Sequence, residues 1–256
     1  MTPRERLREH GWLVVRGAVA PDRVAELARA LDAVIPEASY PAWGERVVEV
    51  AGVSRASPVL AAHARDATLG ALAGAALGAS RVQLLQDTVL VKPAAHPGAV
   101  AWHQDRSYLT YLDPPAVVTV RLALTPCTLA SGCLRVLDGS HRWEHVGENL
   151  ALRRGSVEDE LLAVPDALRA GAAGTEVALE LEPGDVSLHH CLTFHGSRPN
   201  TSARPRKTLV LRLFDGACRL VPDRLPSPEA VAHFPTDADG HLDAAAFPVL
   251  WSAGAG

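Results

Sequence analysis

Two histidines and one aspartate carry the clearest chemical signal in this chain. His103 and Asp105 are two residues apart, and His195 follows far downstream. Two imidazoles and one carboxylate can occupy one face of an iron(II) ion and leave three coordination positions open. In a strand, residues two apart point to the same side, so His103 and Asp105 can reach one ion while Gln104 points away. The three residues therefore predict a redox metal site.

An arginine close to the second histidine predicts a cosubstrate. Arg206 follows His195 by eleven residues. A redox metal that uses an oxo-acid cosubstrate needs a fixed cation to hold the distal carboxylate, and a guanidinium fork suits that task. His189 and His190 compete with His195 for the role of metal ligand. The distance to Arg206 favours His195.

The elements that must position these residues are helices first and strands afterwards. Helices are predicted from Thr2 to Gly11, from Pro21 to Pro36 and over 59–77. Strands are predicted over 12–15, 81–92, 116–124, 132–137, 176–181, 186–190 and 208–214. This order predicts an α+β fold with a mainly β core, in which antiparallel strands form a barrel or sandwich backed by the N-terminal helices. A doubly wound parallel sheet is disfavoured.

We expect one catalytic domain over residues 1–256, with its core at about 11–214. Two segments interrupt the strand pattern, namely 140–174, with a predicted helix at 157–162, and the proline-rich tail 221–256. Long insertions on a barrel often form lids. The alternative is a surface loop and a frayed tail, and the sequence leaves both open.

Composition excludes several classes of function. The 256 residues are 48% hydrophobic, which suits one substantial core. The net charge of −4 comes without a basic stripe, so we expect no nucleic-acid partner. The apolar stretch 69–79 is too short to span a membrane, the N-terminus is charged, and the four cysteines form no Cys-X-X-Cys pair. We expect a cytoplasmic bacterial protein that binds a small molecule, with its oligomeric state open.

Three motifs together resemble the phytanoyl-CoA dioxygenase (PhyH) family. They are Trp102-His103-Gln104-Asp105, the segment from Gly132 to His141, and His195-Gly196-Ser197 continuing through Asn200 to Arg206. The resemblance covers about residues 11–214. It implies a double-stranded β-helix, the cupin-like jelly roll, and the cofactors iron(II), 2-oxoglutarate and dioxygen.

The resemblance also implies roles for individual residues. His103, Asp105 and His195 would be the iron ligands. Arg206 would pair with the C5 carboxylate of 2-oxoglutarate, with a hydrogen bond added by Ser197, and Arg204 is assigned to the surface. Thr88 and Gln104 stand where the family often contacts the cosubstrate, although both equally fit ordinary strand packing.

Arg121 departs from the family pattern, which often has an aromatic residue there. Strand alternation places Thr119, Arg121 and Ala123 on one face, which should line the barrel interior. A buried arginine is costly to leave unpaired. Arg121 should therefore meet a carboxylate of the cosubstrate, of the substrate, or of a nearby Asp or Glu in an internal salt bridge.

Contacts to the substrate are expected from Arg106 and Tyr108, with Trp102 and Tyr111 also flanking the ligands. Trp43 and Arg55 can close the opposite side, although loop packing is the favoured interpretation.

The resemblance implies hydroxylation of an unactivated C–H of a small metabolite in bacterial specialised biosynthesis, with release of succinate and CO₂. Asp105 argues against halogenation, because halogenases usually have a small residue there. Desaturation, epoxidation and cyclisation stay open. So do a non-catalytic jelly-roll metabolite-binding protein and a cupin-like metal enzyme that needs no 2-oxoglutarate.

Overall fold

The computed structural model describes residues 1–143 and 175–254, so most of the predicted insertion and its helix at 157–162 lie outside the described residues. The larger of two main antiparallel sheets contains β1 (Trp12–Val15), β2 (Val48–Ala51), β3 (Arg81–Lys92), β6 (Val117–Ala123), β9 (Val186–His190), β11 (Arg206–Asp215) and β13 (Val249–Ser252). Its order is β1-β9-β6-β11-β3-β13, with β2 also paired to β3.

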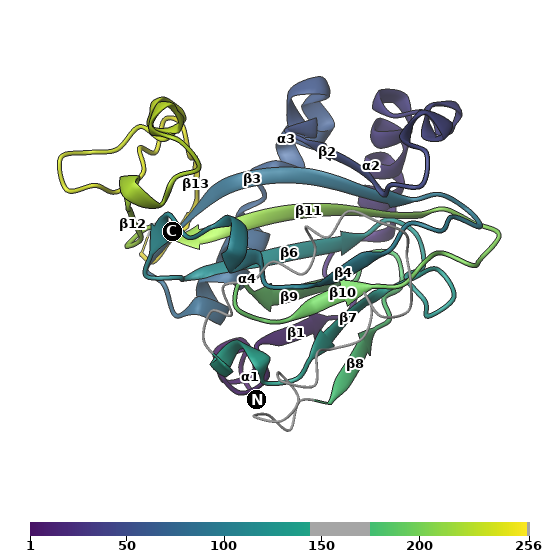
Figure 1. Cartoon of the computed structure of the whole chain (residues 1–256), viewed down its shortest axis with the longest axis horizontal. Helices are drawn as coiled ribbons and strands as arrows, with labels where there is room; N and C mark the ends of the chain where they lie inside the picture. Colours follow the sequence, from purple (N-terminus) through teal and green to yellow (C-terminus); the bar gives the residue numbers. More distant parts are fainter. Residues whose placement is uncertain (144–174, 255–256) are drawn as a thin grey trace.

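The smaller sheet contains β4 (Val100–His103), β7 (Leu134–Leu137), β8 (Glu176–Leu179) and β10 (His195–Ser197). Its order is β4-β10-β7-β8, and a separate pair joins β5 (Leu112–Asp113) to β12 (Arg219–Leu220). Figure 1 shows the smaller sheet beside the larger one, with the helices on the outside. The predicted α+β class with a mainly β core is confirmed.

The α-helices are α1 (Pro3–His10), α2 (Pro21–Val34), α3 (Pro58–Ala64) and α4 (Ala67–Leu77). Thr2 and Glu5 form a capping box at the start of α1, and Gly11 ends this helix at φ 80°, where glycine is favoured. The single helix expected over 59–77 is wrong. Asp66 accepts hydrogen bonds from the backbone N–H groups of Thr68 and Leu69, so it caps a new helix and separates α3 from α4.

Short 3₁₀ helices complete the described chain. They are η1 (Glu37–Trp43), η2 (Val53–Ala56), η3 (Asp105–Tyr108), η4 (Ser140–Trp143), η7 (Pro222–Arg224) and η8 (Pro228–His233). Within the described residues, no helix is both long and apolar enough to cross a membrane.

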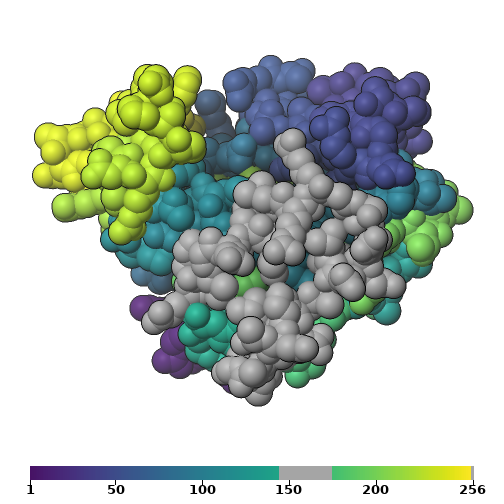
Figure 2. Space-filling model, viewed as in Figure 1, coloured from purple at the N-terminus to yellow at the C-terminus, as the bar shows by residue number. Residues whose placement is uncertain are grey.

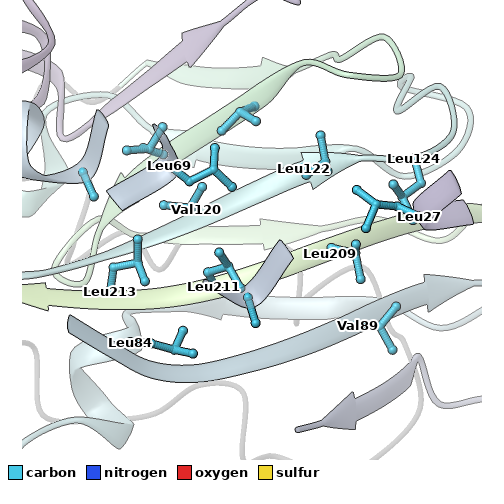
Figure 3. Packing of buried hydrophobic residues seen from close by; sticks show 14 of the residues in the cluster. Leu27, Leu69, Leu84, Val89, Val120, Leu122, Leu124, Leu209, Leu211 and Leu213 are labelled. Carbon is cyan, nitrogen blue, oxygen red and sulfur yellow. The ribbon is translucent and has the colours of Figure 1, made fainter. Parts of the chain in front are cut away.

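The larger sheet has an apolar outer face and a polar inner face. Val118, Val120 and Leu122 of β6 belong to the main hydrophobic cluster, which includes Leu27 of α2 and Leu69 of α4. Figure 3 shows these helical leucines over the sheet. The period of two then turns the intervening residues of β6 inward, as predicted. The outer core thus fixes which side chains face the interior.

The C-terminal tail is packed rather than frayed. β13 pairs with the start of β3, and Leu242 and Phe247 join Tyr111 in a second hydrophobic cluster. Phe234 places its ring 4.8 Å from that of Tyr111. The yellow segment in Figure 1 therefore belongs to the folded body at one end of the larger sheet.

Candidate functional site

The structure brings His103, Asp105 and His195 together. His103 is the last residue of β4 and pairs in register with His195, the first residue of β10. The Nε2 atoms of both histidines lie 3.7 Å from Oδ1 of Asp105. One ligand atom from each residue falls within 4.8 Å of the other two, and all three residues are buried. This is a donor set able to hold one metal ion.

The local geometry differs from the predicted strand. β4 ends at His103, and Asp105 begins η3, so the two side chains converge across a turn rather than along one strand face. Gln104 is 1% exposed and its Nε2 donates to the carbonyl of Leu192. That contact attaches the turn to the loop preceding His195.

Two main-chain carbonyls orient the imidazoles. Nδ1 of His103 lies 2.9 Å from the carbonyl oxygen of Ala101, and Nδ1 of His195 lies 2.9 Å from that of Thr193. Because a carbonyl only accepts, each Nδ1 must carry the hydrogen, which leaves the Nε2 lone pair free. Such an arrangement sets the tautomer needed for metal binding.

Asp105 is held by neighbours on the larger sheet. The Thr119 hydroxyl donates to Oδ2 of Asp105 at 2.5 Å, and Nε2 of His189 lies 3.4 Å from the same oxygen. Nη2 of Arg212 lies 3.9 Å from Oδ1. Burial opposes ionisation, but the charge of Arg212 and the hydrogen bond from Thr119 favour the carboxylate, and the pKa of Asp105 lies well below its ordinary value. Asp105 is therefore a fixed carboxylate.

The neighbouring histidines are neutral. Burial, reinforced by His103 and His189, lowers the pKa of His195 well below its ordinary value. Burial also lowers the pKa of His189, against the pull of Asp105. A neutral imidazole is the form that binds metals.

The cluster opens into a cavity of about 420 Å³ between the two sheets. Ser197 and Arg206 line it, as the resemblance implied. Arg206 is 1% exposed, and its Nη1 donates to the carbonyl of Gly132. Its buried Nε finds no hydrogen-bond partner among the described residues. Arg204 is exposed, as predicted.

Arg121 also lines the cavity and is 6% exposed. Burial and the neighbouring Arg206 lower the pKa of Arg121 to about 10, so the group stays protonated at neutral pH. No hydrogen bond or ion pair joins it to any residue in 1–143 or 175–254. The internal salt bridge is therefore not found within those ranges.

The remaining predicted contacts divide between cavity and core. Tyr108 lines the cavity, 46% exposed, with its ring 6.0 Å from that of His103, and Tyr111 lines it too. Trp102 packs in a cluster with Phe194, and Arg106 donates to the carbonyls of Leu109 and Leu112. The residues that line the cavity do not include Trp102, Gln104, Arg106 or Thr88. The hydroxyl of Thr88 is buried and makes no hydrogen bond to a described residue.

Sequence reasoning considered His189 as a metal ligand and placed Thr119 on the inner face, but it did not predict their contacts with Asp105, nor Arg212 and Gln86 beside the cluster. Thr119 and His189 contact Asp105, and Arg212 donates to Oε1 of Gln86 at 2.6 Å beside it. Thr119 pairs in register with His189 on one side and with Arg212 on the other. The period-two alternation within each strand could have placed these side chains on the inner face. Their contacts with one another depend on the order of the strands in the sheet.

Trp43 and Arg55 lie away from this cavity. Trp43 packs against the main hydrophobic cluster. Arg55 lines a second hollow of about 480 Å³ where β3 is unpaired between β2 and β13. Figure 2 shows a gap between the blue region of α3 and the yellow C-terminal segment on this side. Neither residue closes over the metal cluster.

Comparisons with known proteins agree with the geometry. A sequence model described as phytanoyl-CoA dioxygenase (PhyH) matches residues 7–208. The iron/alpha-ketoglutarate-dependent dioxygenase ausU of Aspergillus calidoustus is 31% identical over 144 residues, which are 53% of this chain and 40% of that protein. The chain spans about half or less of the length of the first curated relatives it matches.

Two solved structures share the fold. The alpha-ketoglutarate-dependent carbocyclase SnoK from nogalamycin biosynthesis has a TM-score of 0.76 at 22% identity, with 96% of this chain and 94% of that chain covered. EctD from S. alaskensis, solved with 2-oxoglutarate and 5-hydroxyectoine, has a TM-score of 0.67 at 25% identity, covering 85% and 76%. The predicted jelly-roll core is confirmed.

Proposed function

The chain belongs to the phytanoyl-CoA dioxygenase family, and we propose that it is an iron(II)- and 2-oxoglutarate-dependent dioxygenase. One observation carries the proposal. The buried cluster of His103, Asp105 and His195 opens into a cavity that Arg206 also lines. A metal site and a carboxylate site thus share one enclosed space.

The donor set fits iron(II). Two imidazoles that direct Nε2 towards one site and one ionised carboxylate form a facial triad with open positions, the set used by non-haem iron(II) oxygenases. Both histidines are fixed from behind by backbone carbonyls. The residues that would hold iron are His103, Asp105 and His195.

The far wall fits the cosubstrate. Among the described residues, the guanidinium of Arg206 donates only to the carbonyl of Gly132, and its buried Nε has no partner; a carboxylate would bind this group bidentately. Ser197 lines the same cavity. Thr88 of β3 and Ser187 of β9 lie in the same cross-strand row as Arg121, and their buried hydroxyls make no hydrogen bond to a described residue. A bound carboxylate would satisfy the unpartnered Nε of Arg206.

When bound, iron(II) with 2-oxoglutarate and dioxygen supplies an oxidant for a C–H bond, and succinate and CO₂ are the coproducts. The chain's residues provide position and exclusion. The Thr119 hydroxyl holds the Asp105 carboxylate in place, and Nε2 of His189 lies 3.4 Å from the same oxygen. Leu90, Val100, Leu134 and Val210 line the cavity with apolar groups that exclude water. Tyr108 and Tyr111 line the same space on the substrate side.

We further propose a small organic metabolite as the substrate, in bacterial specialised biosynthesis. A volume of about 420 Å³ holds a small molecule beside the cosubstrate, not a macromolecule. Asp105 favours hydroxylation over halogenation, while desaturation, epoxidation and cyclisation share the same first step. Four buried free cysteines agree with the proposed cytoplasmic location.

Succinate formation tests the proposal. Anaerobically purified protein is supplied with iron(II), ascorbate, 2-oxoglutarate and dioxygen, with and without a substrate panel, and succinate is quantified. We expect turnover that is lost in Asp105→Ala and kept in the exposed-site variant Arg204→Ala. Cosubstrate binding without succinate across a broad panel would instead favour a metabolite-binding protein. Product formed without 2-oxoglutarate would favour a cupin-like enzyme.

A further inference from the structure

Arg121 is a buried cation that forms no ion pair with a described acid. Its guanidinium reaches the cavity, yet it makes no hydrogen bond or ion pair with the described residues. Two other cations of the same sheet have side-chain partners, whereas Arg206, like Arg121, has no acid partner among the described residues. Lys207, on the outer face, contacts both Asp32 and Glu37, and Arg212 contacts Gln86. A buried, unpaired guanidinium aimed into a cavity indicates a missing anion.

The position of Arg121 along β6 indicates which end of the cavity this anion occupies. Thr119, which holds Asp105, lies two residues earlier on the same face, about 7 Å away along the strand. Arg212 is opposite Thr119, whereas Arg121 is opposite Val210, towards the end of β11 at which Arg206 lies. Arg206 is the charged group that most strongly affects Arg121. Arg121 thus lies between the metal cluster and Arg206.

Exposure separates this end from the substrate side. The side chain of Arg212 is 20% exposed and Tyr108 is 46% exposed, whereas Arg121 and Arg206 are 6% and 1% exposed. An anion that contacts Arg121 must therefore lie deep, next to the group that holds the cosubstrate.

Resting on the proposed function, we propose that Arg121 and Arg206 together bind the distal carboxylate of the cosubstrate, which makes the site selective for dicarboxylic 2-oxo acids. A carboxylate has lone pairs enough for two guanidiniums. The same pairing explains how an arginine is tolerated where the family often has an aromatic residue. Arg121 is then a cosubstrate-binding residue in this chain.

Two opposite effects follow in one variant. In the ligand-free protein the two cations repel and stay desolvated, so Arg121→Met raises the melting temperature, by roughly 2 to 4 °C. With 2-oxoglutarate and manganese(II) under nitrogen, Arg121→Met loses charge-assisted hydrogen bonds, and its Kd rises about 10- to 100-fold. Arg121→Lys restores part of the affinity. The affinity for pyruvate, which lacks the distal carboxylate, stays unchanged.

Lys207→Met is the matched control, because it removes a neighbouring buried cation that faces outward and already has two acids. It should lower the melting temperature and leave the Kd of 2-oxoglutarate unchanged. Melting is followed by scanning calorimetry, and Kd by isothermal titration, which needs no turnover. Glutarate without metal repeats the comparison at the arginine end alone.

Two results would overturn the inference. If Arg121→Met lowers the melting temperature and keeps the wild-type Kd, Arg121 is structural and the dioxygenase proposal survives. If wild-type protein binds no 2-oxoglutarate at all, both proposals fail together. The assignment to the distal carboxylate would also be rejected if Arg121→Met weakened the binding of pyruvate by the same factor as the binding of 2-oxoglutarate.

Discussion

Removing the Thr119 hydroxyl should weaken metal binding without disturbing the fold. The hydroxyl donates to Oδ2 of Asp105 at 2.5 Å, and the two residues are 3% and 2% exposed. Valine keeps the branched shape and the strand preference of threonine, so Thr119→Val deletes one hydrogen bond and little else. A hydrogen bond to a charged group contributes about 1.5 to 3 kcal/mol.

If the hydrogen bond holds Asp105 in its ligating position, its loss lowers the free energy of metal binding by the same amount. Each 1.4 kcal/mol is about tenfold in Kd, so we expect Thr119→Val to raise the Kd for iron(II) by roughly 10- to 100-fold. Mutating groups that orient a metal ligand typically costs about the same. The Kd is measured anaerobically by competition with a fluorescent chelator.

Two further variants make the measurement decisive. Thr119→Ser keeps a hydroxyl and should bind iron(II) nearly as the wild type does. Thr208→Val removes another buried hydroxyl of the larger sheet, one that donates to the carbonyl of Leu90, and should leave the metal Kd unchanged. A Kd for Thr119→Val within about twofold of the wild-type value, in a protein with unchanged melting, would refute the orienting role of the hydroxyl.

Three other perturbations test the core, the arginine anchor and a buried amine. Leu211→Ala should lower the free energy of unfolding by about 2 to 5 kcal/mol, because Leu211 is 2% exposed and belongs to the main hydrophobic cluster. A loss of less than about 1 kcal/mol in a urea titration would contradict this packing. Gly132→Ala should destabilise the fold, because Gly132 has φ +67° and a Cβ would meet the carbonyls of Arg198 and Pro199. It should also weaken 2-oxoglutarate binding, because the carbonyl of Gly132 accepts from Arg206. An unchanged Kd for 2-oxoglutarate in isothermal titration would disprove this link. Burial, with Arg206 and Arg121, lowers the pKa of Lys92 from 10.5 to about 6. Between about pH 6 and 10.5 the unfolded chain therefore binds more protons at this residue than the folded chain does. Lys92 thus makes the free energy of unfolding rise with pH, by up to about 1.4 kcal/mol per pH unit. Lys92→Met should flatten the curve of unfolding free energy against pH, measured from pH 6 to 9.

Strands with one apolar face that packs against the helices could be predicted from sequence. The bounds of 12–15, 81–92 and 186–190 match β1, β3 and β9 as observed. The two strands that contain the histidine ligands could not be predicted. β4 and β10 are four and three residues long and contain the polar groups of the metal cluster, so they show no apolar alternation.

The site divides in the same way. Spacing predicted a site from His103, Asp105, His195 and Arg206, and the structure brings all four to one cavity. Thr119 was placed on the inner face, but its contact with Asp105 depends on how the chain turns after β4. Cross-strand partners follow from strand order and register, which local pattern does not encode.

The metal cluster joins the two sheets. His103 and His195 come from the smaller sheet, whereas Asp105 is held by Thr119 of β6 beside His189 of β9 in the larger one (Figure 1). An ion shared by these residues would act as a cross-link that resists separation of the two halves of the barrel. Metal loading should then slow amide hydrogen exchange in β4 and β10 more than in α1, which lies outside the barrel. The same ion would then stabilise the contact between the two sheets.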